Sequence, residues 1–302
     1  MPLKEAPGRT PMAYAEEGPS PGSAGAVSGN PPLVFVHGWA AHGGLFAPQF
    51  ARFADSHRVI APDLRGHGRS RAGAAPDIAG MADDVAALLE DLDLDGVVAV
   101  GWSMGAAVLW DLLRRSPAAE RIAGLVVVDM TPRILNDVSW RLGLAGGFDA
   151  LDSARAAMRM REDWRAYSVR VAANALASEG APTALLETLQ ADFAENDPEL
   201  MAQAWESLCA MDLREDIARI ATPTLVAYGA RSQLYEPEVS AYLVERAPNA
   251  VRVSFQRSGH APHLEEPERF NRLLNDFVAI LSGQDARRDI ARLGENAAAH
   301  QA

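Results

Sequence analysis

Short apolar runs alternate with segments of helical periodicity along the first half of the chain. A short run without polar positions is typical of a strand that is buried on both faces. Apolar residues spaced three and four positions apart predict helices between these runs. This alternation predicts the α/β class, with a mostly parallel sheet covered by helices on both faces. The predicted strands are residues 33–36, 58–61, 97–100 and 122–128, and the predicted helices are residues 81–92 and 106–115.

The pattern changes after residue 132, where helical segments follow one another without an obvious strand. These segments occupy residues 149–176, 183–195 and 198–211; strand patterns return at 224–228 and 250–254, and an amphipathic helix follows at 267–281. We interpret the helical stretch as a cap inserted into one α/β core. The predicted division is a core of residues 1–132 and 217–282, a helical cap of residues 133–216, a flexible C-terminal tail of residues 283–302, and a mobile loop at residues 18–32.

The composition limits the cellular compartments and the classes of partner that we expect. The chain has 302 residues, of which 48% are hydrophobic, so it can bury one large core. Its formal net charge of −12 repels phosphate backbones, so nucleic acid is not an expected partner. Cys209 is the single cysteine, which excludes an internal disulfide, and no segment has the ~20 apolar residues of a membrane span. We therefore expect a soluble, cytoplasmic protein with no membrane partner and an unspecified oligomeric state.

A Gly-x-Ser-x-Gly sequence occupies residues 101–105, between the predicted strand 97–100 and the predicted helix 106–115. A sharp strand-to-helix turn with a glycine on each side projects a serine hydroxyl above the edge of the sheet. Ser103 is therefore a candidate nucleophile, provided that a base lies close enough to take its proton. The pentapeptide alone recurs by chance, but its position between a strand and a helix makes the signal specific.

This turn and two further motifs resemble those of the α/β-hydrolase superfamily. The resemblance extends from Leu33 to Leu281 and implies the α/β-hydrolase fold. Residues 34–39, Val-Phe-Val-His-Gly-Trp, look like that family's oxyanion loop, and residues 62–70, Pro-Asp-Leu-Arg-Gly-His-Gly-Arg-Ser, look like its turn after the next strand. The resemblance implies an oxyanion hole made by the backbone N–H groups of Trp39 and Met104. It also implies that His37 holds the oxyanion loop rather than reacting.

The same resemblance implies that the catalytic base is the histidine of the late Gly259-His260 pair. His263 follows three residues later and is expected to support this loop or the start of the next helix. The commonest family pattern places the acid three residues after the glycine that follows the strand 224–228. Here that residue is Ser232, which cannot serve as an acid.

A carboxylate is still required to hold the tautomer of the base and to stabilise its protonated form. Asp129 closes the strand 122–128, beside the strand that delivers Ser103. Its Val-Asp-x-x-Pro segment is similar to that of small bacterial esterases whose acid follows this earlier strand. Neighbouring strand ends lie only ~5 Å apart, so Asp129 is the predicted acid, with Glu236 and Glu238 as alternatives.

Aromatic residues near these motifs and in the predicted cap indicate an apolar substrate pocket, which suits an acyl chain or an aromatic group. We predict that Trp102 and Tyr235, beside the motifs, and Trp140 and Trp164, in the cap, bind substrate. Other cap aromatics, Tyr167, Phe193 and Trp205 among them, are expected to be mostly core. No metal-ligand pattern and no Gly-rich nucleotide loop is present, so neither a metal nor a cofactor is expected.

These observations predict a serine esterase, a carboxylic-ester hydrolase that cleaves a small acyl substrate through an acyl-enzyme intermediate. Thioesterase, lactonase, carbon–carbon bond hydrolase and perhydrolase activities on the same triad stay open, because the shape of the cap selects the leaving group. The alternative from another class is a non-catalytic relative that binds a small ligand or a partner protein. A fold that is shared by many functions does not decide among them.

Overall fold

The computed structural model describes residues 3–5, 12–19, 30–71, 75–281, 283 and 293. Within these residues, eight strands form one sheet in the order β1-β2-β4-β3-β5-β6-β7-β8. β1 pairs antiparallel with β2 and β2 with β4, whereas the strands from β4 to β8 pair in parallel. The strands are β1 (Leu3–Glu5), β2 (Ala13–Glu17), β3 (Leu33–Val36), β4 (Val59–Pro62), β5 (Val97–Trp102), β6 (Ile122–Val128), β7 (Thr224–Gly229) and β8 (Ala250–Phe255).

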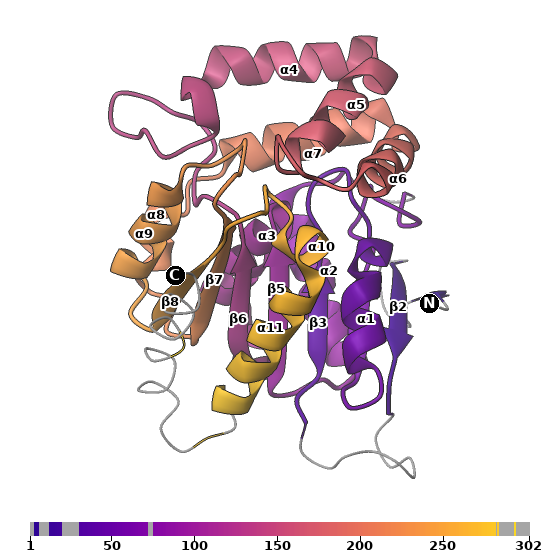
Figure 1. Ribbon diagram of the computed structural model, residues 1–302, viewed down its shortest axis with the longest axis vertical. Helices are drawn as coiled ribbons and strands as arrows, with labels where there is room; N and C mark the ends of the chain where they lie inside the picture. The colour runs from indigo at the N-terminus through magenta and orange to yellow at the C-terminus, as the bar shows by residue number, and fades with distance from the viewer. Residues whose placement is uncertain are drawn as a thin grey trace.

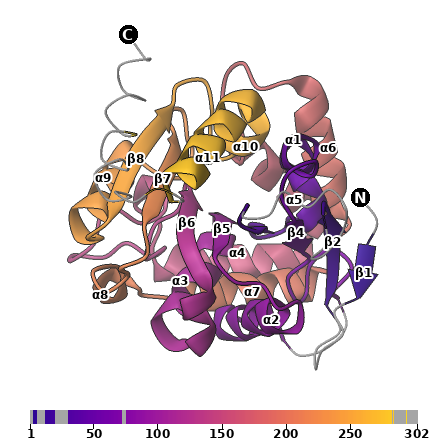
Figure 2. The ribbon, with the colours of Figure 1, turned by 90° about the horizontal axis from the view of Figure 1, so that it is seen from below.

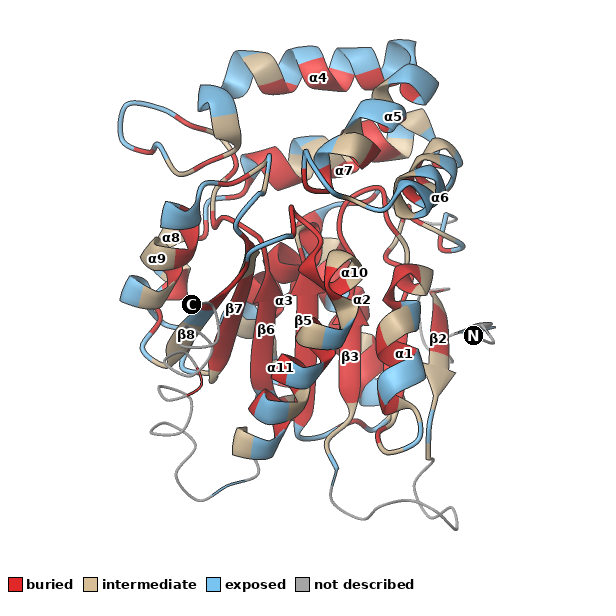
Figure 3. Cartoon of the chain, in the orientation of Figure 1, coloured by how far each residue is buried: buried red, intermediate tan, exposed pale blue. Residues whose placement is uncertain are grey.

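Helices cover both faces of this sheet, as Figure 2 shows. α1 (Ala47–Phe53) and α11 (Pro267–Leu281) lie on one face, and α2 (Ile78–Asp91) and α3 (Met104–Arg115) lie on the other. Every residue of β3, β4 and β5 is buried as a result, which explains why these strands are continuous apolar runs (Figure 3). The predicted α/β class, with a mostly parallel sheet between two helical layers, is confirmed.

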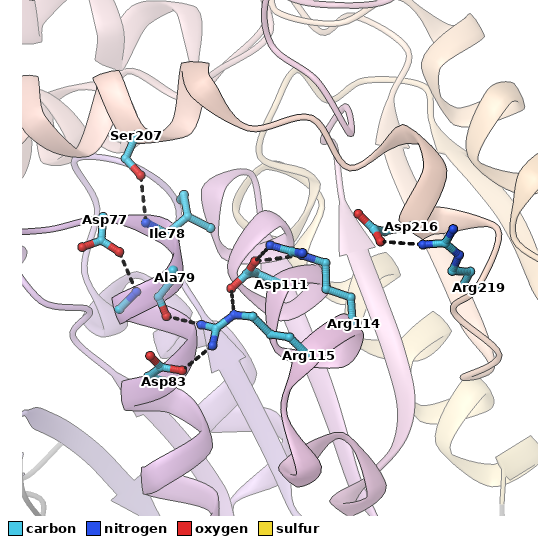
Figure 4. Close-up of polar contacts among 11 residues, drawn as sticks. Asp77, Ile78, Ala79, Asp83, Asp111, Arg114, Arg115, Ser207, Asp216 and Arg219 are labelled. Atoms are coloured by element: carbon cyan, nitrogen blue, oxygen red, sulfur yellow. Dashed lines mark hydrogen bonds and ion pairs between the residues drawn. The ribbon is translucent and has the colours of Figure 1, made fainter.

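Polar contacts join α2 to its neighbours on the second face (Figure 4). Arg115 of α3 forms an ion pair with Asp83 of α2 at 2.6 Å, and it also bonds Asp111 and the carbonyl of Ala79. At the first turn of α2, the N–H of Ile78 donates to the Ser207 hydroxyl at 3.0 Å. Because Ser207 belongs to α7 (Pro198–Ala210), this bond ties the sheet-covering layer to the helices above it.

Four helices, α4 to α7, lie over the carboxyl ends of the parallel strands (Figure 1). None of the eight described strands falls between residues 133 and 216, although the division into core and cap stays a prediction. The predicted helical segment 149–176 is not continuous, because Asp163 leaves helical geometry (φ −150°, ψ 77°) and its side chain accepts from Ala166 N–H to begin a new helix. The helices are α4 (Ala150–Glu162), α5 (Trp164–Asn174) and α6 (Thr183–Ala194), followed by α7.

Several short elements were not predicted from the sequence: β1, β2, α1, α8 (Arg214–Ile217), α9 (Pro237–Arg246) and α10 (Pro262–Glu265). Most of the predicted mobile loop, residues 20–29, lies outside the described residues. So does the predicted tail, apart from Gly283 and Leu293. In the part of the chain that the structure describes, no helix is long and apolar enough to cross a membrane.

Candidate active site

Ser103 sits at the turn between β5 and α3, at the carboxyl end of the sheet, with φ 52° and ψ −122°. The two flanking glycines are required by close packing. A Cβ on Gly101 would lie 2.6 Å from the nitrogen of Ala106, and a Cβ on Gly105 would lie 2.1 Å from the carbonyl oxygen of Val36. Only glycine therefore permits α3 to start so close to β5 and β3, which is the turn that the Gly-x-Ser-x-Gly pattern predicts.

Asp129 ends β6, the strand next to β5, and it also has a positive φ, 46°. Its N–H donates to the carbonyl of Ala227 in β7 at 2.9 Å, and the N–H of Ser103 donates to the carbonyl of Val128 at 2.9 Å. The sheet register therefore fixes both backbones side by side. The Asp129 residue is only 4% exposed, so its carboxylate depends on protein groups for hydrogen bonds.

His260 lies between β8 and α10 and contacts Asp129. Its Nδ1 lies 2.8 Å from Asp129 Oδ2, and both side chains are buried. Because Nδ1–H donates to the carboxylate, Nε2 is the ring nitrogen that is free to accept a proton. The Trp102 indole N–H donates to the His260 carbonyl at 2.8 Å. Ser103 and His260 line the same cavity, although no hydrogen bond joins them among the contacts of the described residues.

The loop that carries His260 is held by contacts that the sequence did not reveal. A Cβ on Gly229, at the end of β7, would lie 1.7 Å from the carbonyl oxygen of Gly259, so the two loops meet backbone to backbone. Glu265 Oε1 accepts from the N–H groups of Gly259 (2.8 Å) and Ala261 (3.3 Å), on both sides of His260. Burial raises the pKa of Glu265, and these N–H groups offset part of that rise.

The neighbouring His263 has a different environment. Its ring is packed against Phe46 and Trp102, with ring centroids 4.9 and 4.8 Å away, and it is fully buried. Neither ring nitrogen has a hydrogen-bond partner among the described residues. Burial, with a further contribution from His260, lowers the pKa of His263 to about 3, so this ring is neutral. The structure thus brings His260, and not His263, to Asp129.

The loop after β3 lies against the Ser103 turn. A Cβ on Gly38 would lie 3.1 Å from the Ser103 Cβ. His37 stabilises this loop, because its Nε2 accepts from Leu64 N–H at 2.9 Å and its Nδ1–H donates to the Gly38 carbonyl at 2.8 Å. The loop therefore brings the backbone of Trp39 close to the nucleophile turn.

The predicted oxyanion donors, Trp39 N–H and Met104 N–H, belong to this loop and to the first residue of α3. No acceptor for either group is found among the described backbone hydrogen bonds. Free N–H groups at a helix start and in an adjacent loop are suited to binding a negatively charged oxygen.

Position 232 also contacts the site, whereas the alternative acids do not. Ser232 Oγ donates to Asp129 Oδ2 at 2.7 Å, a contact that sequence reasoning missed because Ser232 was considered only as an acid. Glu236 and Glu238 are exposed at the start of α9, and neither lines the cavity. Asp129 is the carboxylate that the structure brings to His260.

The cavity above Ser103 has a volume of about 130 Å³ and is mostly apolar. Two of the four predicted substrate contacts, Trp102 and Tyr235, line it. Residues of the predicted cap complete the wall, and three of its aromatic residues, Tyr167, Phe193 and Trp205, face the cavity. The lining residues are Gly38, Trp39, Trp102, Ser103, Leu144, Tyr167, Val171, Asn174, Ala175, Phe193, Trp205, Leu208, Leu234, Tyr235 and His260.

Trp140 and Trp164, the other two predicted substrate contacts, do not line this cavity. The Trp140 ring packs against Tyr242 at 4.9 Å and its N–H donates to the Arg133 carbonyl. Trp164 packs edge-on against Trp39 at 5.6 Å, behind the cavity wall. Both are buried aromatic side chains with their N–H groups satisfied, and residue type alone does not distinguish such a side chain from a pocket wall.

A second hollow, of about 320 Å³, adjoins the cavity. The two share Tyr167, Val171 and Asn174 of α5. Three exposed arginines on α4 and α5 surround this second hollow: Arg155, Arg159 and Arg170. One carboxylate, Asp152, also lines this hollow and lies 3.8 Å from Arg155, so arginines outnumber acidic side chains there, in a chain whose net charge is strongly negative. Across the described residues, no cluster of three or more His, Cys, Asp or Glu side chains is arranged to hold a metal ion.

Comparisons with known proteins agree with the observed fold. A family model for the alpha/beta hydrolase fold matches residues 31–267. A pimeloyl-[acyl-carrier protein] methyl ester esterase from Chromobacterium violaceum is 31% identical over 256 residues, which cover 82% of this chain and 94% of that protein. Esterase RhEst1 from Rhodococcus sp. ECU1013 has a TM-score of 0.74 and 26% identity over 93% of this chain and all of its own. An esterase from Exiguobacterium antarcticum has a TM-score of 0.81 and 22% identity, covering 92% and 98%.

Proposed function

The chain belongs to the α/β-hydrolase fold family, and from this premise we propose that Ser103, His260 and Asp129 form the triad with which it hydrolyses carboxylic esters. The protein is a carboxylic-ester hydrolase, the class of activity that its named relatives share. The observation that carries the assignment of residues is a single cavity lined by Ser103 and His260, with His260 Nδ1 bonded to a buried Asp129.

In the proposed acylation step, Nε2 of His260 takes the Ser103 proton as Oγ attacks the carbonyl carbon of the ester. The Ser103 hydroxyl turns toward the ring as substrate enters, since catalytic hydrogen bonds tighten in the complex. Electrons of the carbonyl bond move to its oxygen, which accepts from the N–H groups of Trp39 and Met104. When this intermediate collapses, the bond to the alcohol oxygen breaks and His260 returns the proton to the leaving alcohol.

In the second step, water replaces the alcohol. His260 takes a proton from water as the water oxygen attacks the acyl carbon, and the bond to Ser103 Oγ then breaks. Ser103 recovers its proton from His260 and a carboxylic acid leaves. Asp129 stays ionised throughout, because its task is to hold the Nδ1–H tautomer and to stabilise the imidazolium.

The walls of the cavity support a compact, apolar acyl group as substrate. A cavity of about 130 Å³ is close to the size that holds one benzene-sized group, so a short chain or a single ring fits the observed volume. We propose that residues 133–216 act as a cap, because Leu144, Tyr167, Phe193 and Trp205 close the cavity above Ser103. A cytoplasmic location stays a prediction from the sequence.

The test is hydrolysis of p-nitrophenyl esters from acetate to dodecanoate, together with labelling by a fluorophosphonate. Ser103→Ala is expected to abolish labelling, and Ser103→Ala and Asp129→Asn to lower kcat by at least about 10³-fold. Full activity of Asp129→Asn would place the acid elsewhere. A wild-type protein that neither hydrolyses esters nor reacts with the phosphonate would favour a non-catalytic ligand-binding relative.

We also propose a finer substrate, an ester whose acyl chain is attached to a carrier protein. Only the ester end of such a chain would occupy the cavity, and the rest would extend along the second hollow. The observation in its favour is the second hollow, which is lined by three arginines, Arg155, Arg159 and Arg170, and one carboxylate, Asp152. It shares Tyr167 and Val171 with the cavity. Opposite charges on two partners steer their encounter and fix their orientation. The relatives named as pimeloyl-[acyl-carrier protein] methyl ester esterases act on an ester of this kind.

Charge reversal at the hollow tests this substrate. The double variant Arg159→Glu/Arg170→Glu is expected to raise KM at least about tenfold for a methyl pimeloyl group on acyl-carrier protein, and to leave kcat/KM for p-nitrophenyl acetate within about twofold. Arg219→Glu, an exposed arginine after α8, is the control for a change of net charge. Equal losses on both substrates would contradict carrier recognition. They would not contradict the proposal that the protein hydrolyses esters.

A further inference from the structure

The contacts of Ser232 orient its hydroxyl toward the triad acid. Ser232 lies three residues after Gly229, the last residue of β7. Its Oγ accepts from the N–H groups of Leu234 and Tyr235, each at 3.3 Å. Because a hydroxyl has one proton to donate and these two N–H groups approach its oxygen, the proton is directed at Asp129 Oδ2, 2.7 Å away.

The same carboxylate oxygen serves two donors. Asp129 Oδ2 accepts from Ser232 Oγ at 2.7 Å and from His260 Nδ1 at 2.8 Å. The Asp129 side chain is 4% exposed, so solvent contributes little to holding it. A hydroxyl donor stabilises the ionised carboxylate without adding a charge, whereas a second carboxylate at this distance would oppose its ionisation.

We propose that Ser232 is a positioning residue for the reaction: it fixes Asp129 in the orientation that His260 needs. Ser232 does not line the cavity, so its effect on catalysis passes through Asp129 and not through substrate. The inference rests on the proposed triad. It gives a function to the position where the commonest family pattern has the acid itself.

The effect is measurable as a loss of kcat at unchanged KM. Ser232→Ala is expected to lower kcat about tenfold, the factor for one hydrogen bond to a charged group, with KM within about twofold of wild type. Ser232→Thr keeps the hydroxyl and is expected to restore most of kcat. Ser240→Ala, which removes a buried hydroxyl bonded to the Pro237 carbonyl, is the control and is expected to keep wild-type kcat. Thermal unfolding of each variant separates a loss of folding from a loss of function.

A double-mutant cycle distinguishes positioning from a general structural effect. If Ser232 acts through Asp129, adding Ser232→Ala to Asp129→Asn lowers kcat by less than about twofold, because the group it positions has already lost its charge. A further tenfold loss in that background would overturn the proposal, as would an unchanged kcat for Ser232→Ala alone while Asp129→Asn is inactive. Full activity of Asp129→Asn would instead overturn the triad itself.

Discussion

Ser103 and Asp129 directly follow two neighbouring parallel strands, β5 and β6, and each has a positive φ, 52° and 46°. Non-glycine residues rarely adopt such angles. Each instance costs about 1–3 kcal/mol and persists only where the surrounding structure enforces it. Of the four non-glycine residues with positive φ in the described part of the chain, three lie at this site: Ala40, Ser103 and Asp129. Unfavourable backbone geometry is therefore concentrated where the proposed nucleophile, acid and oxyanion loop are brought together.

This relationship predicts a gain of stability when the nucleophile is lost. Ser103→Gly removes the Cβ that makes φ 52° unfavourable, so we expect the free energy of unfolding to rise by about 1 kcal/mol while activity disappears. Ser103→Ala is the matched control, since it also removes the hydroxyl but keeps the Cβ and the strain. Urea unfolding of the three proteins measures the difference. Equal stability of the Gly and Ala variants would show that the turn is not strained.

Three neutral histidines predict a protein that is sensitive to acid. His37, His67 and His263 are fully buried, and burial lowers the pKa of each from 6.5 to about 3. Below pH 6.5 the unfolded chain binds protons that the folded chain does not, so stability falls as pH drops from 6.5 toward 3. Each histidine contributes a slope of about 1.4 kcal/mol per pH unit in that window.

Urea unfolding at several pH values between 7.5 and 4.5 measures this slope. His263→Leu replaces one ring, which has no hydrogen-bond partner among the described residues, by an apolar side chain. It is expected to lower the slope by about 1.4 kcal/mol per pH unit, the share of one histidine, without abolishing activity. His42→Leu is the comparison variant, because burial lowers the pKa of His42 but its hydrogen bond to Asp192 raises it above the ordinary value, so this replacement is not expected to lower the slope. An unchanged slope for His263→Leu would mean that this ring binds a proton equally in the folded and unfolded protein.

The sequence predicted the strands β3 to β8 and the turn at Ser103 because both depend on local patterns, whereas His260 and Asp129 were predicted through the resemblance to the α/β-hydrolase superfamily. Continuous apolar runs identify strands buried on both faces, and the glycines at 101 and 105 are required by contacts of 2.6 and 2.1 Å. The walls of the cavity could not be assigned in this way. Trp140 and Trp205 are both tryptophans of the predicted cap, yet of the two only Trp205 faces the cavity. The packing of the cap on the core decides which of its side chains face the cavity, and the sequence pattern does not show this packing. The Ser232 contact depends on two loops that are 103 residues apart in sequence.

This difference between two tryptophans gives a prediction about acyl selectivity. Trp205→Ala removes part of the cavity wall, so longer acyl chains are expected to bind. Each additional buried methylene contributes about 0.8 kcal/mol, or roughly fourfold, and we expect the ratio of kcat/KM for decanoate over butyrate to rise about tenfold. Trp140→Ala is the matched control: it lies outside the cavity and is expected to lower stability with the chain-length profile unchanged. A changed profile in Trp140→Ala would restore its predicted contact with substrate.

We also predict that the triad carboxylate can be transferred from position 129 to position 232. An aspartate reaches about 1.2 Å further than a serine, one C–O bond length, and the Ser232 oxygen already contacts the carboxylate that holds His260. Asp129→Asn/Ser232→Asp is therefore expected to recover at least about tenfold of the kcat lost in Asp129→Asn, because a carboxylate at position 232 can accept from Nδ1–H.

Asp129→Asn/Ser232→Asn is the control for this exchange, since it has nearly the same size and no charge. Recovery of kcat by the aspartate and not by the asparagine would show that the carboxylate that binds the His260 imidazole can come from either of two neighbouring strand ends. Failure of both, in variants that unfold at the wild-type temperature, would mean that the loop after β7 directs residue 232 at Asp129 alone. The backbone N–H groups of Leu234 and Tyr235 would then be the cause, because their hydrogen bonds fix the direction of the side chain at position 232 whichever residue is placed there.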